Sequence, residues 1–153
     1  EQCAASALAF LKGRGFAEME VPYYQVYDGL CVLTCVYVQS GVLVWPDRVL
    51  VQVRMDTLDI VGVEARHYLT SHTKRENLTP VIGEQEARAA ISGRLENVTS
   101  RLCLIPQNGR EYLCWEFTGE YRGDTYYVYV DAMTGQQREI QKLVQTNIGL
   151  NAS

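Results

Sequence analysis

The sequence lacks most of the features that mark enzymes and metalloproteins. It has only two histidines, His67 and His72, and no glycine-rich phosphate loop. Nucleophilic catalysis needs a nucleophile, a base and an orienting acid, and a metal site needs three or four ligands. No nucleophile stands at a strand-to-helix elbow, and no third metal ligand lies near the two histidines in the sequence. The sequence therefore predicts a protein without catalytic residues, metal or cofactor.

Positive charge and long apolar runs are also scarce. The formal net charge is −4, which argues against nucleic acid or an anionic membrane surface as a partner. No apolar run reaches the length of about 20 residues that a membrane-spanning helix needs, and no signal-peptide pattern opens the chain. Because the 153 residues are 47% hydrophobic and 21% charged, we expect an ordinary globular protein of one domain or two small ones.

Five cysteines are present, but none forms a Cys-x-x-Cys pair, so the usual redox and structural zinc motifs are missing. Cys103 and Cys114 fall opposite each other when the chain is folded at Asn108-Gly109. A disulfide fits that arrangement, and so do two small buried thiols. The cysteine pattern leaves both alternatives, and with them the redox compartment, open.

Residues 99–144 predict three or four antiparallel strands joined by tight turns. Asn108-Gly109 favours a type I′ hairpin, because both central residues of that turn need a positive φ. A second turn at Arg122-Gly123 brings Phe117 opposite Val128. Folding at both turns places seven apolar side chains on one face, namely Leu102, Leu104, Leu113, Trp115, Phe117, Val128 and Val130. Two independent turns that agree on one apolar face support this register, and residues 131–135 close a third turn.

The first half of the chain predicts a similar order of elements. Residues 4–12 favour a helix because they are rich in helix formers. Extended segments are expected at residues 19–27, 30–39, 49–55 and 60–68. The Trp-Pro-Asp of residues 45–47 is expected to interrupt the chain before the third segment. Residues 83–91 favour a second short helix with two acidic residues in its first turn.

The two halves form an internal repeat. Residues 33–38 match residues 112–117, and residues 51–57 match residues 128–134. We therefore expect an α+β fold of two tandem modules, each a short helix packed on an antiparallel meander. The expected boundaries are residues 1–70 for the first module, 71–79 for a linker and 80–153 for the second module.

The polar, unpatterned residues 67–80 contain the expected linker. Both histidines lie within this segment, so we expect them to be solvated. An exposed linker is also the place where a protease would cut, and residues 71–78 are the expected site.

The second half resembles the PepSY domain, most openly in residues 126–135, where a strand ends in Asp-Ala-x-Thr-Gly. A longer match covers nearly the whole chain and is similar to the C-terminal region of the YpeB family of spore germination proteins. Its pieces are residues 16–20, 27–29, 37–39, 45–47, 59–65 and 72–75. Each piece is short, but their order and spacing together are specific.

The resemblance implies a non-enzymatic regulator of spore germination. Its expected partner is a SleB-type cortex-lytic cell-wall hydrolase, which it would bind, stabilise and restrain. The family also implies a location in the spore envelope, on the outer side of the spore inner membrane, through a membrane segment upstream of these residues. Two alternatives stay open: a propeptide-like protease inhibitor or chaperone, and an envelope module that senses a small ligand. The oligomeric state is not indicated.

Tyrosines form the candidate partner-binding surface. Tyr121, Tyr127 and Tyr129 cluster in the second half, and the register places Tyr127 and Tyr129 on the face opposite Trp115. Such an aromatic face must be covered, either by another part of the chain or by a partner. Tyrosine is enriched at protein interfaces because it buries a large area and keeps a polar group. These three tyrosines are therefore the candidates for a partner-binding surface, and packing between the two repeats is the alternative that stays open.

Overall fold

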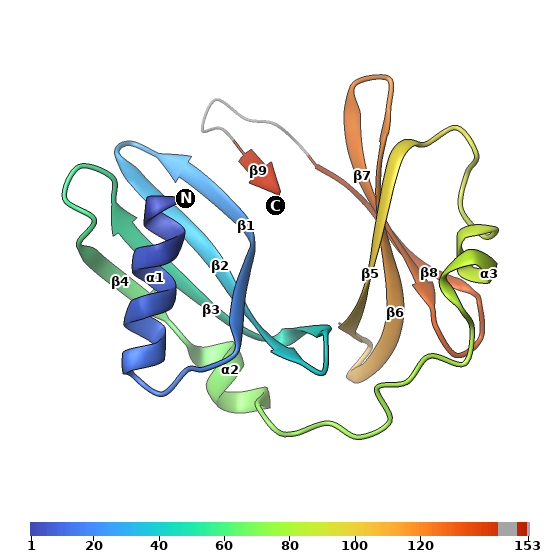
Figure 1. Cartoon of the computed structure of the whole chain (residues 1–153), viewed down its shortest axis with the longest axis horizontal. Helices are drawn as coiled ribbons and strands as arrows, with labels where there is room; N and C mark the ends of the chain where they lie inside the picture. The colour runs from blue at the N-terminus through green and yellow to red at the C-terminus, as the bar shows by residue number, and fades with distance from the viewer. Residues whose placement is uncertain (144–149, 153) are drawn as a thin grey trace. The chain divides into compact units, whose positions relative to one another are not determined.

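The computed structural model describes residues 1–143 and 150–152. Along the first half the elements are α1 (Gln2–Gly13), β1 (Met19–Tyr27), β2 (Leu30–Gln39), β3 (Val42–Arg54), β4 (Ile60–Glu64) and α2 (Arg66–Ser71). Along the second half they are α3 (Glu84–Arg88), β5 (Glu96–Gln107), β6 (Arg110–Tyr121), β7 (Asp124–Asp131), β8 (Gln137–Lys142) and β9 (Leu150–Ala152). The first half is a helix followed by four strands and the short α2, and the second half is a short helix followed by four strands and the short β9, so the predicted α+β repeat is confirmed (Figure 1). Val144, the last residue of the predicted stretch, lies outside the described residues.

Two compact units divide the chain. The first contains Glu1–Gln39 and Val44–Lys74, and the second contains Ser40–Leu43 and residues 75–143. The change from Lys74 to Arg75 lies inside the segment predicted as a linker. The assignment of the β2–β3 turn to the second unit was not predicted, because nothing in residues 40–43 distinguishes them from an ordinary hairpin turn.

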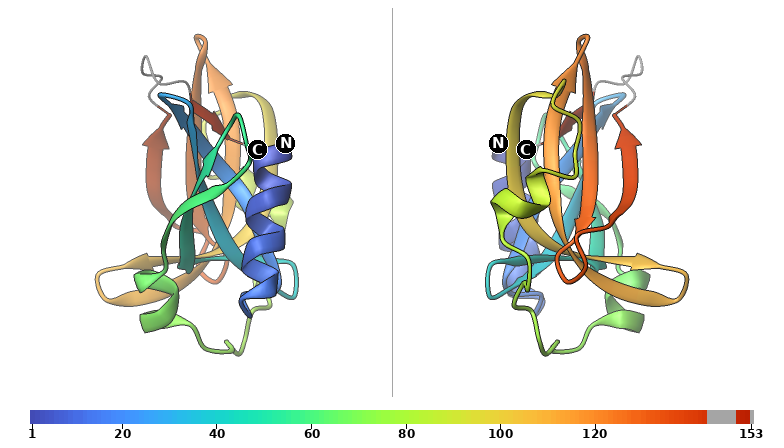
Figure 2. Two further views of the ribbon diagram at one scale, coloured as in Figure 1. Left: turned by 90° about the vertical axis from the view of Figure 1, so that its left-hand side faces the viewer. Right: turned by 90° about the vertical axis from the view of Figure 1, so that its right-hand side faces the viewer.

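The first unit is a helix on a sheet whose strands are ordered β4-β3-β2-β1, with β9 pairing β1. Figure 2 (left) shows α1 running along this sheet. Ala7 and Leu11 of α1 are fully buried against the sheet. The residues of β2 and β3 in this core are Cys31, Leu33, Cys35, Val49, Val51 and Val53. Valine thus alternates with Gln52 and Arg54, and at the end of β3 Val49, Val51 and Val53 lie in the core, as predicted.

The second unit repeats this arrangement with strands in the order β8-β7-β6-β5 (Figure 2, right). The predicted register is confirmed: Leu104 pairs with Leu113, and Phe117 pairs with Val128. Phe117, Val128 and Val130 form the core together with Ala87 of α3. Asn108 and Gly109 have φ values of 52° and 77°, as a type I′ turn requires. Cys103 and Cys114 lie opposite each other as buried free thiols.

Two local predictions in the first unit were wrong. Pro46 and Asp47 do not interrupt the chain but lie within β3, since Val44 and Val49 on either side are fully buried and hold the strand in place. Residues 66–71, expected to be extended or unpatterned, form α2. Both errors concern the same place, because α2 packs beside the Pro46–Asp47 segment.

Candidate functional site

The three predicted tyrosines lie on β6 and β7 of the second unit but differ in burial. Tyr121 and Tyr127 are half-buried, whereas Tyr129 is only 5% exposed. Tyr129 lies opposite Glu116 on β6 and is hydrogen-bonded to that side chain, which is itself buried. Burial, followed by the negative charge of Glu116, raises the pKa of Tyr129 well above its ordinary value. Tyr129 therefore contributes to the internal packing of the chain and offers no exposed surface to a partner.

The remaining two tyrosines are placed differently. Tyr127 pairs with Thr118 of β6 and with Gln141 of β8. Tyr121 ends β6, and the guanidinium of Arg122 lies 5.2 Å from the centre of its ring. A cation over an aromatic face stabilises both groups and orients them. A partner surface on these strands thus remains a prediction that rests on Tyr121 and Tyr127.

A polar cluster that the sequence did not indicate lies in the first unit, where α2 meets β3. The Asp47 side chain is fully buried, and its Oδ2 lies 2.7 Å from Nδ1 of His72. Its Oδ1 lies 2.7 Å from the Ser71 hydroxyl, which is also 2.9 Å from the carbonyl oxygen of Pro46. A buried carboxylate is costly unless it is hydrogen-bonded, and here both oxygens are occupied.

Aromatic rings enclose the His72 imidazole. The Tyr68 ring stacks on it at 4.2 Å with an interplanar angle of 13°, and the Tyr37 ring meets it edge-on at 4.7 Å. Burial, followed by the charge of Asp47, raises the pKa of the Tyr68 hydroxyl. His72 is therefore a packed residue with a side chain about one-third exposed, and the prediction that both histidines are solvated is wrong for it. The other histidine, His67, contacts the guanidinium of Arg48 at 3.3 Å.

This cluster does not have the geometry of a catalytic triad. In a triad the imidazole lies between the hydroxyl and the carboxylate, so that it can accept the hydroxyl proton. Here the Ser71 hydroxyl contacts the carboxylate of Asp47 directly. Within residues 1–143 and 150–152, no three histidine, cysteine or carboxylate side chains come together as a metal site would require. The cluster fastens the end of α2 to β3.

The second unit has its own buried carboxylate, Asp131, at the end of β7. Its Oδ1 accepts hydrogen bonds from the backbone N–H groups of Met133 and Thr134, at 2.8 and 3.1 Å. Its Oδ2 accepts a hydrogen bond from Nε of Arg138 at 2.7 Å. Burial alone would raise the pKa of Asp131, but the hydrogen bonds from Arg138 and the two N–H groups hold it below its ordinary value. This contact set explains the Asp-Ala-x-Thr-Gly pattern, because the aspartate organises the turn that follows it.

Arg138 is held in turn by β5 and β6. Its guanidinium carbon lies 3.8 Å from the centre of the Tyr112 ring, and its Nη1 lies 3.4 Å from the side-chain oxygen of Gln107. The aspartate, the arginine and the aromatic ring thus form one packed group. The group connects the turn after β7 to β5 and β6 and so stabilises the sheet.

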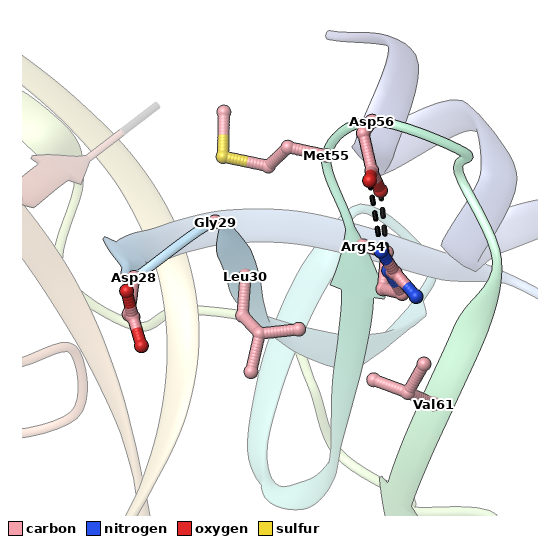
Figure 3. A pocket seen from close by; sticks show the side chains of 7 residues that line it. All are labelled: Asp28, Gly29, Leu30, Arg54, Met55, Asp56 and Val61. Atoms are coloured by element: carbon pink, nitrogen blue, oxygen red, sulfur yellow. Dashed lines mark hydrogen bonds and ion pairs between the residues drawn. The ribbon is translucent and has the colours of Figure 1, made fainter.

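An open hollow in the first unit lies between the β1–β2 turn and the turn after β3 (Figure 3). Its lining residues are Asp28, Gly29, Leu30, Arg54, Met55, Asp56 and Val61. The charged pair in it is internal, because Arg54 donates two hydrogen bonds to Asp56 at 2.8 and 3.1 Å. Both of these side chains are more than half exposed, so the charged part of the hollow is open to solvent.

The sequence missed the Asp47 cluster because its parts lie in segments expected to be a turn and a linker. One signal could have found it. Residues 42–44 and 49–53 are both rich in valine, and a single strand through Pro46 joins them. A buried strand that carries an aspartate needs a partner for the carboxylate, and the nearby histidines are the natural candidates.

Comparisons with known proteins agree with this repeat. Residues 1–78 match the family described as YpeB sporulation, PepSY1 and PepSY2 domains, and residues 81–141 match the Peptidase propeptide and YPEB domain. The helix-on-meander units and the aspartate-centred turn of the second unit define a protein built from PepSY domains. More specifically, the chain belongs to the YpeB family of sporulation proteins.

Individual relatives support this assignment. The chain is 36% identical over 140 residues to the sporulation protein YpeB of Bacillus subtilis, and 33% identical over 143 residues to that of Halalkalibacterium halodurans. These matches cover 90% and 93% of this chain but only 31% and 32% of the relatives, so the chain spans about a third of their length. The solved YpeB C-terminal domain of Bacillus megaterium superposes with a TM-score of 0.82 at 28% identity, covering 94% of this chain and 64% of that one. Among the described residues, no helix is long and apolar enough to cross a membrane.

Proposed function

We propose that this chain acts in spore germination by binding, stabilising and restraining a SleB-type spore cortex-lytic hydrolase. The observation that carries the proposal is the family match, which extends over both units. The proposed mechanism is protein contact without chemistry.

The test combines binding with activity. The chain is titrated into its cognate cortex-lytic enzyme in a calorimeter, and hydrolysis of cortex peptidoglycan is followed in the same samples. Binding with loss of hydrolysis supports restraint by these two units. Binding with unchanged hydrolysis but a higher melting temperature of the enzyme supports stabilisation alone, since a ligand that binds the native state stabilises it. No measurable binding contradicts the proposal for this part of the protein.

Tyr121 and Tyr127 are the proposed contact residues. Replacing either by alanine removes a half-exposed aromatic ring, and interface tyrosines contribute about 1–2 kcal/mol, or roughly tenfold in affinity. Tyr27→Ala is the matched control, because Tyr27 is 57% exposed in the first unit and lies outside the proposed surface. If the three variants Tyr127→Ala, Tyr121→Ala and Tyr27→Ala bind the hydrolase with equal affinity, the contact must lie elsewhere on the chain.

The proposed place of action is the spore envelope, on the outer side of the inner membrane. The support is the family's role in sporulation, together with the need to meet a cell-wall hydrolase. Fractionation of spores with an antibody against this chain tests the location. Recovery of the chain in the spore core fraction would contradict it.

A second function is favoured by one observation. Residues 81–141 match a domain family whose description names peptidase propeptides. The chain would then inhibit a secreted protease. Measuring the activity of a secreted protease with increasing amounts of the chain tests this function. A dose-dependent loss of protease activity in the absence of the cortex-lytic hydrolase would favour this function over the first.

A further inference from the structure

Two thiols from different elements of the first unit meet at the edge of its core. Cys3 lies in the first turn of α1, and Cys31 is the second residue of β2. The Cys3 and Cys31 side chains are hydrogen-bonded to each other, and Cys3 packs against the core cluster that contains Cys31. This pair could not be predicted from the sequence, because the two residues are far apart along the chain and belong to no motif.

The two thiols differ in their access to solvent. Cys31 is 3% exposed, and burial, followed by the neighbouring Cys3, raises its pKa to about 11. Cys3 is half-buried, so a small reagent reaches it in the folded protein. The other three cysteines, Cys35, Cys103 and Cys114, are all fully buried. Reaction of those three with a reagent in solution requires local opening of the fold.

We propose that Cys3 and Cys31 form a reversible disulfide that fastens α1 to β2. The oxidant is a low-molecular-weight disulfide. The Cys3 thiol loses its proton and attacks the oxidant, whose S–S bond breaks and releases one small thiol. Cys31 then loses its proton and attacks the Cys3 sulfur of the mixed disulfide, which releases the second small thiol. Two protein thiols are oxidised while one small disulfide is reduced to two thiols, so protons and electrons balance.

The consequence is a redox-dependent stability of the first unit. A disulfide between these positions closes a loop that contains most of α1, all of β1 and the first turn of the sheet. Closing a loop of this length restricts the unfolded chain, and we expect a rise of roughly 5–10 °C in melting temperature on oxidation. Cys103 and Cys114 also face each other, but inside a hairpin, where a cross-link would close a much shorter loop.

The test exposes the whole folded chain to oxidised glutathione and then blocks free thiols with an alkylating reagent. We expect an intact mass lower by two hydrogens, three alkylated cysteines after unfolding, and a non-reducing digest that joins the peptides of Cys3 and Cys31. A reductant should restore five free thiols and the lower melting temperature. A cross-link between Cys103 and Cys114, a glutathione adduct that persists on Cys3, or no reaction would each overturn the proposal.

Two variants give a matched comparison. Cys3→Ala changes a half-buried residue and should abolish both the cross-link and the rise in melting temperature. Cys35→Ala removes another thiol from the same strand and should keep both. If Cys35→Ala proves too unstable to purify, Cys103→Ala serves the same purpose in the other unit. Retention of the cross-link in Cys3→Ala would overturn the assignment.

Discussion

The turn after β3 and the turn after β7 share one backbone structure but differ in the side chains that support it. In the first unit the N–H of Arg54 bonds the carbonyl oxygen of Asp59 at 2.9 Å, and in the second the N–H of Asp131 bonds that of Gln136 at 2.8 Å. The residue in the left-handed conformation is Leu58 (φ 62°) in one turn and Gly135 (φ 80°) in the other. The two turns therefore have the same hydrogen bonds, although little of their sequence is shared.

The difference lies in the residue that begins each turn. Asp131 is buried and paired with Arg138, whereas the equivalent Arg54 is half-exposed and paired with Asp56. The buried carboxylate of the first unit, Asp47, lies instead within β3 and pairs with His72. Each unit thus has a buried aspartate, and the two aspartates occupy different places in the fold. The same backbone hydrogen bonds therefore form in both turns, while the buried aspartate lies at the turn in the second unit and within β3 in the first.

The largest expected effect in this comparison is that of Asp131→Ala. The change removes three hydrogen bonds and leaves the guanidinium of Arg138, only 22% exposed, without its carboxylate. Breaking a buried pair by removing one partner is strongly destabilising, and we expect a loss of about 3 kcal/mol in the free energy of unfolding. Urea denaturation followed by tryptophan fluorescence measures it, since Trp115 packs against the core of this unit. A loss below about 1 kcal/mol would show that the turn does not depend on its acid.

The pH dependence of stability sharpens the same contrast. The pKa of Asp131 in the folded protein is lower than its ordinary value of 3.8. Its contribution is therefore complete above the unfolded pKa and is lost as the pH falls through the folded pKa. We expect Asp131→Asn to weaken the acid-induced loss of stability below about pH 4. Equal pH profiles of the variant and the wild type, measured by urea denaturation, would contradict this sign.

The corresponding change in the first unit is His72→Ala. The change removes the 2.7 Å contact between Nδ1 of His72 and the fully buried carboxylate of Asp47. A lost hydrogen bond to a charged group costs about 1.5–3 kcal/mol, and the stacking of His72 on Tyr68 is lost with it, so we expect a loss of about 2 kcal/mol. His67→Ala is the control, because His67 contacts the side chain of Arg48 and not the buried acid. Equal unfolding free energies for the two variants would mean that the buried acid finds another partner.

The next largest loss of stability is expected from replacing Gly135, the residue in the left-handed conformation in the turn after β7. A side chain at Gly135 would combine φ of 80° with a Cβ only 2.9 Å from Cδ1 of Ile82. We expect Gly135→Ala to lower the free energy of unfolding by about 1–2 kcal/mol. Gly93→Ala is the matched control, since no atom lies within 4 Å of its Cβ position and its φ is not in the left-handed region. A neutral Gly135→Ala would show that this turn tolerates a side chain as the Leu58 turn does.

These contrasts show which features the sequence could predict. The register of the second unit followed from Asn108-Gly109, because a two-residue turn and an alternating pattern fix every later pair. Tyr129 was placed on the correct strand and face, but its burial depends on packing that no local pattern records. The Asp47 cluster was missed for the same reason, since the burial of a strand through Pro46 is a property of the assembled sheet. Local turn chemistry could be predicted, whereas long-range partners of polar groups could not.

The smallest expected effect is that of Asp56→Ala. It removes the ion pair with Arg54 in the turn equivalent to that of Asp131, but both side chains are more than half exposed. Exposed ion pairs contribute little to stability because water and salt screen them, so we expect the smallest loss of the series, and one that disappears in high salt. The free energy of unfolding at low and high ionic strength measures both parts of this expectation. A salt-independent loss comparable to that of Asp131→Ala would mean that the exposed aspartate supports its turn as the buried one does, and the contrast between the two units would fail.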